Sequence, residues 1–203
     1  MTSRCLFFYK IACNLNNFKL RQICVFSIKK NMEIKKNIAL IGMMGSGKSS
    51  VGSSLTKYLT NTFYDLDREV EKKFNLSVKD IFTEYGEDLF RKEESDLLKE
   101  FNHGSDLIIS TGGGIVICKK NREILKQHKT YFLKAEIKDM YNRATKKENN
   151  RPLLKGIEIE EFEKLYLERE NLYTECAKSI INVSNKSIED ITTEIIKNEE
   201  NTI

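Results

Sequence analysis

A glycine-rich turn at residues 42–49, with the sequence GMMGSGKS, is the feature that most restricts what this chain can fold into. It fits the pattern G-x-x-x-x-G-K-[ST], in which glycines let backbone N–H groups curl around an anion without a side-chain clash. The apolar run IALI at residues 38–41 precedes the turn, and Val51, Leu55 and Leu59 recur every fourth residue after it. This order predicts a buried strand, a phosphate-binding loop and a helix whose N-terminus also attracts anions.

The individual positions of the loop predict how a nucleotide would be held. Lys48 has the reach to contact terminal phosphates, and the Ser49 hydroxyl is suited to a Mg²⁺ shell. The neighbouring positions expected to bind ATP are Gly45, Ser46, Gly47 and Ser50. A chance glycine-rich turn is the alternative, and the strand and helix on either side argue against it.

Short apolar runs alternate with longer amphipathic segments along the rest of the chain, which is typical of parallel strands joined by helices. Further strands are predicted at residues 62–64, 106–110, 130–133 and 179–183. Helices are predicted at residues 68–102 with a break near Gly86, at 137–147, at 159–176, and after a capping box of Ser187 and Asp190. We therefore expect one α/β domain at residues 33–203, preceded by a leader at residues 1–32.

Charge is unevenly distributed along the 203 residues. Six of the 34 basic residues and none of the 30 acidic ones lie in residues 1–31, so the remainder has a net charge of −2. This balance does not favour general nucleic-acid binding. No apolar run approaches the ~18 residues of a membrane-spanning helix, so we expect no membrane partner.

The basic leader is compatible with a transit peptide or with a secretory signal, although Lys10 interrupts its apolar stretch. We favour a third interpretation, in which translation starts at Met32, because that segment leads directly into the first strand. Outside the leader, only Cys118 and Cys176 occur, and no Cys-x-x-Cys pair is present, which fits a reducing compartment. We expect a cytoplasmic protein, with organellar import through residues 1–31 as the less favoured alternative.

An arginine lies where the predicted helix at residues 159–176 would be apolar. Arg169 is in the middle of a stripe made of Phe162, Leu165, Tyr166, Leu172 and Tyr173. A buried guanidinium needs an anion to offset its desolvation. An internal carboxylate and a bound ligand both satisfy this need, and the pattern leaves the two open.

A second charged residue shares an apolar helical face. Glu94 has the spacing of Phe90, Leu97 and Phe101, and Arg91 lies three residues before it. Such a carboxylate could orient the guanidinium so that its free edge faces a substrate. An ordinary surface ion pair is the alternative.

Three further sites carry residues suited to ligand binding. Asp65 and Asp67 follow a predicted strand, where alternate residues of an extended segment would face one crevice; helix capping by one of them is the alternative. The three glycines at residues 112–114 permit close backbone approach to a ligand. Arg151 precedes the only proline in a polar loop that could be a lid with a phosphate-neutralising cation or simply a solvated basic loop.

Together these segments resemble the shikimate kinase family over about residues 36–185. The matching segments, in the family's order, are the 42–49 loop, Asp65-Leu-Asp67, Gly86 through Glu94, Ser110 through Gly114, Arg151 through Leu154, and Arg169 through Tyr173. The resemblance implies a nucleoside-monophosphate-kinase-like fold with a five-stranded parallel sheet in the order 2-3-1-4-5 and a mobile lid. It also implies transfer of a phosphoryl group from ATP to the 3-hydroxyl of shikimate, in the route to chorismate and the aromatic amino acids.

The resemblance implies a role for each candidate residue. Arg91 and Arg169 would hold the shikimate carboxylate, while Asp67 and the backbone at Gly113 would bind ring hydroxyls. Asp67 would also accept or orient the proton of the acceptor hydroxyl. Lys48 and Arg151 would offset charge on the transferred group, and Ser49 would ligate Mg²⁺ with Asp65 acting through water. The family is expected to be monomeric.

Other functions fit these residues less well. A gluconate kinase of the same fold would lack the paired arginines that suit a ring carboxylate. A binding protein that has lost its chemistry would show a degenerate loop, whereas Lys48, Ser49, Asp65, Asp67 and Arg151 are all present. A GTPase would need an Asn-Lys-x-Asp motif, which this chain lacks.

Overall fold

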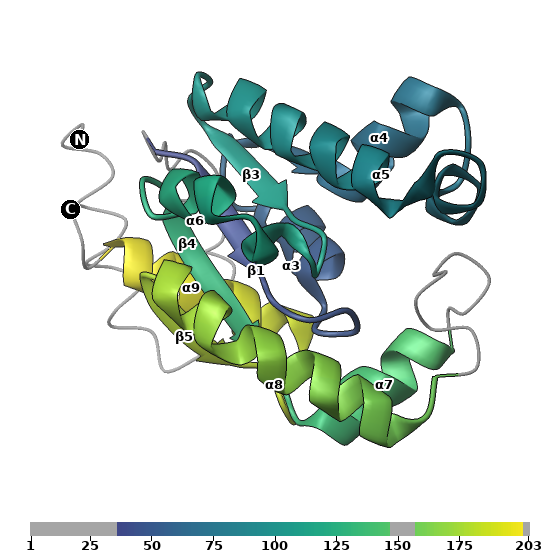
Figure 1. Cartoon of the computed structure of the whole chain (residues 1–203). Helices are drawn as coiled ribbons and strands as arrows, with labels where there is room; N and C mark the ends of the chain where they lie inside the picture. Colours follow the sequence, from purple (N-terminus) through teal and green to yellow (C-terminus); the bar gives the residue numbers. More distant parts are fainter. Residues whose placement is uncertain (1–35, 147–156, 201–203) are drawn as a thin grey trace, which may run out of the picture.

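The structure, a computed structural model, describes residues 36–146 and 157–200 (Figure 1). One parallel sheet of five strands in the order β2-β3-β1-β4-β5 forms its centre. The strands are β1 (Ile38–Ile41), β2 (Thr62–Asp65), β3 (Leu107–Ser110), β4 (Lys129–Lys134) and β5 (Ser179–Asn182). The predicted parallel sheet, its flanking helices and its strand order are confirmed, and both ends of each predicted strand lie within one residue of the observed ends. The lid predicted around Arg151 lies outside the described residues. The leader predicted at residues 1–32 lies outside the described residues.

Helices cover both faces of the sheet. They are α3 (Lys48–Leu55), α4 (Leu66–Phe74), α5 (Val78–Asn102), α6 (Lys119–Leu125), α7 (Ile137–Thr145), α8 (Ile159–Cys176) and α9 (Ile188–Glu200), with a short 3₁₀ helix, η1 (Ile115–Ile117). Helices α6 and α8 pack together in front of the sheet, and α3 and α9 pack together behind it (Figure 1). No helix in the described ranges is long and apolar enough to cross a membrane.

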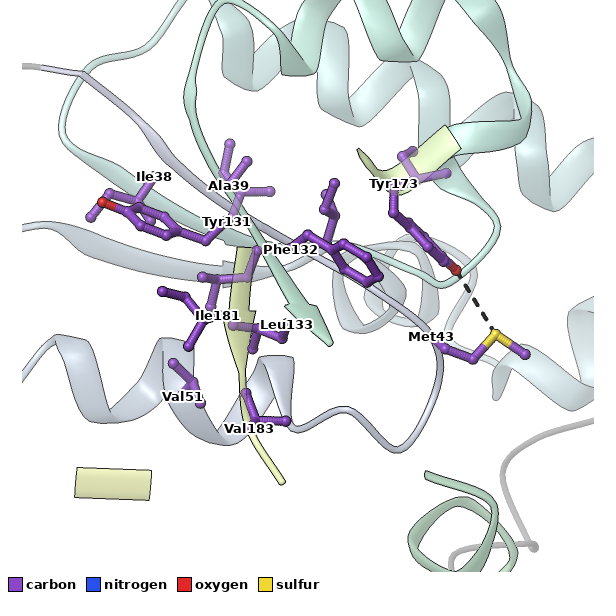
Figure 2. Packing of buried hydrophobic residues seen from close by; sticks show 14 of the residues in the cluster. Ile38, Ala39, Met43, Val51, Tyr131, Phe132, Leu133, Tyr173, Ile181 and Val183 are labelled. Carbon is purple, nitrogen blue, oxygen red and sulfur yellow. Dashed lines mark hydrogen bonds between the residues drawn. The ribbon is translucent and has the colours of Figure 1, made fainter. Parts of the chain in front are cut away.

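Burial explains why these segments form these elements. All four residues of the central strand β1 are buried, as expected for a parallel strand covered on both faces. Around it, side chains from β4, β5, α3 and α8 form the main core (Figure 2). Within that core the rings of Phe132 and Tyr173 stack with centroids 5.0 Å apart, which joins α8 to the sheet. The capping box predicted for the last helix is confirmed, since Ser187 and Asp190 exchange backbone-to-side-chain hydrogen bonds of 3.1 and 3.2 Å.

The prediction of a helical segment over residues 68–102, broken only near Gly86, was wrong in two respects. The first helix already begins at Leu66, so Asp67 lies in its first turn rather than in an extended segment. The main interruption falls at residues 75–77, where Asn75 adopts a left-handed conformation with φ of 53° and Ser77 caps α5. The predicted break at Gly86 is present as a kink, with φ of 83°, inside α5.

Strand register brings the candidate residues to one edge of the sheet. Asp65 pairs with Ser110 across β2 and β3, and Ser110 pairs with Leu40 across β3 and β1. The segments that follow these three strands are the 42–47 loop, the start of α4 and the 111–114 turn. Because parallel strands end at the same edge, all three segments meet there, where ligands bind in open α/β folds.

Candidate active site

The phosphate loop connects β1 to α3, as predicted. Gly45 has φ of 82°, and a Cβ atom there would lie 2.1 Å from the carbonyl oxygen of Met140, so a larger residue does not fit. The first turn of α3 contains no acidic residue, so the helix itself adds no negative charge at its partially positive N-terminus. The loop and this helix end together present backbone donors to an anion.

The side chains of the loop differ in their surroundings. Lys48 is buried, and its ammonium group donates to the carbonyl oxygens of Gly42 at 2.9 Å and Met43 at 3.0 Å. The buried hydroxyl of Ser46 has no hydrogen-bond partner among the described residues. Ser49 and Ser50 are exposed on the first turn of α3. The loop thus contains a cation and an unsatisfied hydroxyl, both of which suit a phosphate.

Oxygen atoms from three elements meet beside the loop. The Ser49 hydroxyl donates a 2.5 Å hydrogen bond to Oδ2 of Asp65. The Ser110 hydroxyl lies 3.5 Å from the Ser49 hydroxyl. Asp65 is buried at the end of β2, and its side chain does not cap α4. Hard oxygen donors of this kind suit Mg²⁺, which takes one or two protein ligands and completes its shell with water and phosphate oxygens. The described residues contain no group of three His, Cys, Asp or Glu side chains that could hold a metal.

Asp67 lies on the other side of this edge, against the glycine turn. A Cβ atom on Gly112 would lie 2.7 Å from Oδ1 of Asp67 and 2.2 Å from Oε1 of Glu94. A side chain at residue 112 would collide with both carboxylates, so glycine fits this position best. The structure brings Asp67 and Glu94 together from α4 and α5, a proximity that the sequence did not predict.

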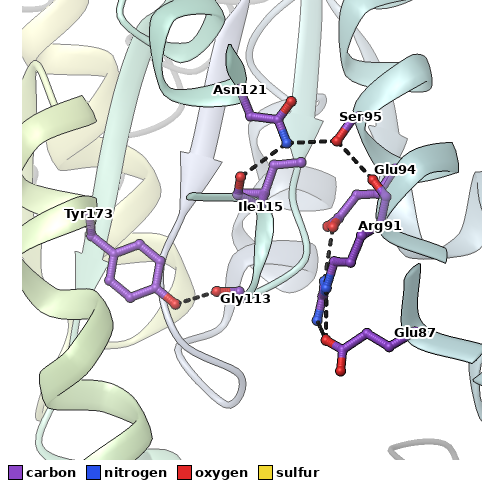
Figure 3. Close-up of polar contacts among 8 residues, drawn as sticks. All are labelled: Glu87, Arg91, Glu94, Ser95, Gly113, Ile115, Asn121 and Tyr173. Atoms are coloured by element: carbon purple, nitrogen blue, oxygen red, sulfur yellow. Dashed lines mark hydrogen bonds and ion pairs between the residues drawn. The ribbon is translucent and has the colours of Figure 1, made fainter. Parts of the chain in front are cut away.

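Arg91 is held in place by neighbours on its own helix (Figure 3). Its Nη1 donates to Glu94 at 2.9 Å, and its Nε and Nη2 donate to Glu87 at 3.0 and 2.9 Å. The guanidinium also lies over the ring of Phe90, 5.4 Å from its centroid. A Cβ atom on Gly114 would lie 2.4 Å from its Cζ atom, so the guanidinium contacts the glycine turn. The hypothesis that Glu94 orients Arg91 agrees with this geometry.

Glu94 is an unusual partner for an arginine because it is completely buried. Burial and the nearby charge of Asp67 raise the pKa of Glu94 to about 7, against the opposing effect of the Arg91 guanidinium. One fully buried carboxylate thus shares a site with a partly exposed carboxylate and a partly exposed guanidinium. A group with this balance gains or loses a proton near neutral pH.

Arg169 is buried on α8, on the same face as Phe162 and Tyr173, as the stripe predicted. No described carboxylate forms an ion pair with it, and its Nη1 atom has no hydrogen-bond partner among the described residues. This favours the ligand-anchor alternative over an internal salt bridge. Burial raises the pKa of Tyr173, while the guanidinium groups of Arg169 and Arg91 lower it, which places both arginines within electrostatic range of one hydroxyl.

Tyr173 contacts the glycine turn but was not among the predicted site residues. The sequence predicts only that it belongs to the apolar stripe, whereas its hydroxyl donates to the carbonyl oxygen of Gly113 at 2.5 Å (Figure 3). A local sequence signal for this contact is lacking because the two residues are 60 positions apart. Arg151, predicted to neutralise phosphate charge, lies outside the described residues.

Comparisons with known proteins agree with this site. A family model described as shikimate kinase matches residues 44–200. The shikimate kinase of Dictyoglomus turgidum is 40% identical over 168 residues, which cover 81% of this chain and 97% of that protein. The shikimate kinase of Enterococcus faecalis is 40% identical over 164 residues, which cover 80% and 97%.

Solved structures lead to the same assignment. The shikimate kinase of Acinetobacter baumannii, whose structure is a complex with shikimate, superposes with a TM-score of 0.79 at 32% identity and covers 84% of this chain and 96% of that one. The family model's match from residue 44 to residue 200 includes the glycine turn, both arginine-bearing helices and all but the first two residues of the loop. The chain therefore belongs to the shikimate kinase family.

Proposed function

We propose that the residues of this site carry out the family's reaction in this chain, each in a specific role. The chain is a shikimate kinase, which transfers a phosphoryl group from ATP to shikimate in aromatic amino acid biosynthesis. The acceptor is the 3-hydroxyl, and the products are shikimate 3-phosphate and ADP. The observation that carries the assignment of the site is that both arginines lie close to the glycine turn: Arg91 contacts Gly114, and Arg169 acts on the Tyr173 hydroxyl, which binds Gly113.

The two arginines are proposed to hold the carboxylate of shikimate. Arg169 has an unsatisfied buried nitrogen, which an anion would satisfy. Three of the five N–H donors of Arg91 are used by Glu87 and Glu94, so its remaining donors can face a substrate. A planar guanidinium fork matches a carboxylate in a way that an ammonium group does not.

Asp67 and the backbone at Gly113 are proposed to bind the ring hydroxyls of shikimate. Asp67 is partly exposed and contacts the glycine turn, so its carboxylate can accept a hydrogen bond from a substrate hydroxyl in that crevice. It would hold the acceptor hydroxyl in line and accept or orient its proton. Because the transition state of phosphoryl transfer is loose, this positioning matters more than the strength of the base.

The phosphate loop is proposed to hold ATP through residues 45–50. Backbone N–H groups and the Ser46 and Ser50 hydroxyls would contact phosphate oxygens, and Lys48 and Arg151 would offset charge on the transferred group. Ser49 is proposed to ligate Mg²⁺ directly, with Asp65 acting through water, and their 2.5 Å hydrogen bond fits such a pair. The ion would supply charge neutralisation at the phosphates.

Three properties of the whole chain are proposed alongside the reaction. Translation is proposed to start at Met32, which makes residues 1–31 dispensable for activity. The free thiols of Cys118 and Cys176 support a reducing, cytoplasmic location. The enzyme is proposed to act as a monomer, and size-exclusion chromatography with light scattering would test this oligomeric state. It is also proposed to act without nucleic-acid or membrane partners.

The reaction is tested by measuring ADP release from ATP and Mg²⁺ with added shikimate, with gluconate, or with no acceptor. The full chain and residues 32–203 are measured in parallel. ADP release that depends on shikimate in both proteins supports the proposal and shows that residues 1–31 are dispensable for catalysis. ADP release with gluconate alone, or none with shikimate while ATP still binds, contradicts it.

A further inference from the structure

A single hydroxyl connects the helix that bears Arg169 to the glycine turn. Tyr173 is completely buried, its ring stacks on Phe132, and its hydroxyl donates to the carbonyl oxygen of Gly113 at 2.5 Å (Figures 2 and 3). The same hydroxyl lies 3.8 Å from the sulfur of Met43 in the phosphate loop. Arg169 is one helical turn before Tyr173 on the same buried face. The phosphate loop, the glycine turn and the helix that bears Arg169 therefore meet at the Tyr173 hydroxyl.

The opposite side of the glycine turn is held by different residues. The carboxylates of Asp67 and Glu94 pack against Gly112, and the guanidinium of Arg91 packs against Gly114. Between these contacts the backbone of Gly113 has no side chain of its own to fix it, and glycine has the widest conformational freedom of any residue. The Tyr173 hydroxyl is the polar contact that holds this middle residue from the side of α8.

We propose that Tyr173 is a positioning residue that fixes the Gly113 peptide group relative to Arg169, so that the turn and the arginine can bind one acceptor molecule together. The proposal rests on the proposed function, because it assigns the acceptor to this turn. The carbonyl of Gly113 and the amide of Gly114 belong to one planar peptide unit, so holding the oxygen also fixes the direction of that amide. Loss of the hydroxyl would loosen the turn without removing any group that touches ATP.

The test is the variant Tyr173→Phe, which keeps the ring on Phe132 and removes only the hydroxyl. The matched control is Tyr166→Phe, since Tyr166 is also buried on α8 and its hydroxyl binds Glu170 at 2.8 Å, away from the turn. We expect Tyr173→Phe to raise the KM for shikimate about tenfold, the effect of one buried hydrogen bond, and to leave the KM for ATP within about twofold. Tyr166→Phe is expected to change neither KM.

A second variant separates the hydroxyl from the packing of the ring. Phe132→Leu removes the stacking partner and leaves the hydroxyl, so it is expected to lower Tm without a selective change in the KM for shikimate. The inference is overturned if Tyr173→Phe leaves the KM for shikimate unchanged, if it raises both KM values equally, or if Phe132→Leu reproduces its selective effect. Wild-type ADP release is measured in the same assay. Its dependence on shikimate identifies a failure of the proposed function separately from a failure of this inference.

Discussion

The guanidinium of Arg91 donates a 2.9 Å hydrogen bond to Glu94, a carboxylate that is completely buried and that faces a second carboxylate, Asp67, across Gly112. Burying charge in this way is costly unless the charges are paired. The pair orients Arg91 toward the glycine turn, and the nearby Asp67 charge makes Glu94 prone to protonation. Under the proposed roles, the side chains that orient Arg91 for substrate also set the electrostatic cost of burying Glu94.

The variant Glu94→Gln is expected to change how stability depends on pH. Because burial and Asp67 raise the pKa of Glu94 to about 7, the folded protein retains a proton that the unfolded chain releases above its ordinary pKa of 4.5. The wild-type free energy of unfolding therefore falls, relative to Glu94→Gln, as the pH rises from about 4.5 to 7, by up to about 3 kcal/mol. Urea unfolding at pH 5 and pH 8 measures this difference. Glu87→Gln, at the exposed partner of Arg91, is the control, and parallel pH profiles for wild type and Glu94→Gln would contradict the account.

The variant Asp67→Asn is expected to lower kcat by about 100-fold or more, because an amide cannot accept the proton of the acceptor hydroxyl and orients it poorly. The KM for ATP should stay within about twofold, since ATP is assigned to the loop. Glu69→Gln on the same helix, at a half-buried partner of the exposed Lys72, is the control. Steady-state ADP release checks both variants, and an Asp67→Asn enzyme with wild-type kcat would refute the assigned role.

The variant Ser49→Ala is expected to raise the Mg²⁺ concentration needed for half-maximal activity about tenfold, because it removes one oxygen donor and the partner that orients Asp65. Ser53→Ala, at an exposed position of the same helix, should leave it unchanged. ADP release is titrated with Mg²⁺ at a fixed ATP concentration. Identical Mg²⁺ dependence in Ser49→Ala and wild type would exclude this assignment of the ion.

Elements with a strong local pattern were predictable from the sequence. The buried strand at residues 38–41 and the helix at residues 159–176 were predicted with their observed ends, because an apolar run and a 3.6-residue period mark them. Arg169 was predicted to be buried for the same reason. The extended placement of Asp67 failed because β2 is short and partly exposed, and α4 begins directly at its end.

Contacts between distant elements could not be predicted. The approach of Asp67 to Glu94 depends on how α4 packs on α5, and the bond from Tyr173 to Gly113 depends on how α8 packs on the glycine turn. No periodicity in one segment encodes such a distance. The glycines were a partial signal, since they indicated close approach without showing which side chains approach.

The most direct test of the two-arginine carboxylate site compares shikimate with its methyl ester in wild type and in Arg169→Met, with Arg68→Met as an exposed control. The account predicts that wild-type kcat/KM is at least about 100-fold lower for the ester, because the charge-assisted hydrogen bonds to the carboxylate are lost. In Arg169→Met that ratio should shrink to about tenfold or less, because half of the site is already gone. An ester-to-acid ratio that is the same in wild type and Arg169→Met would contradict the claim that Arg169 binds the carboxylate.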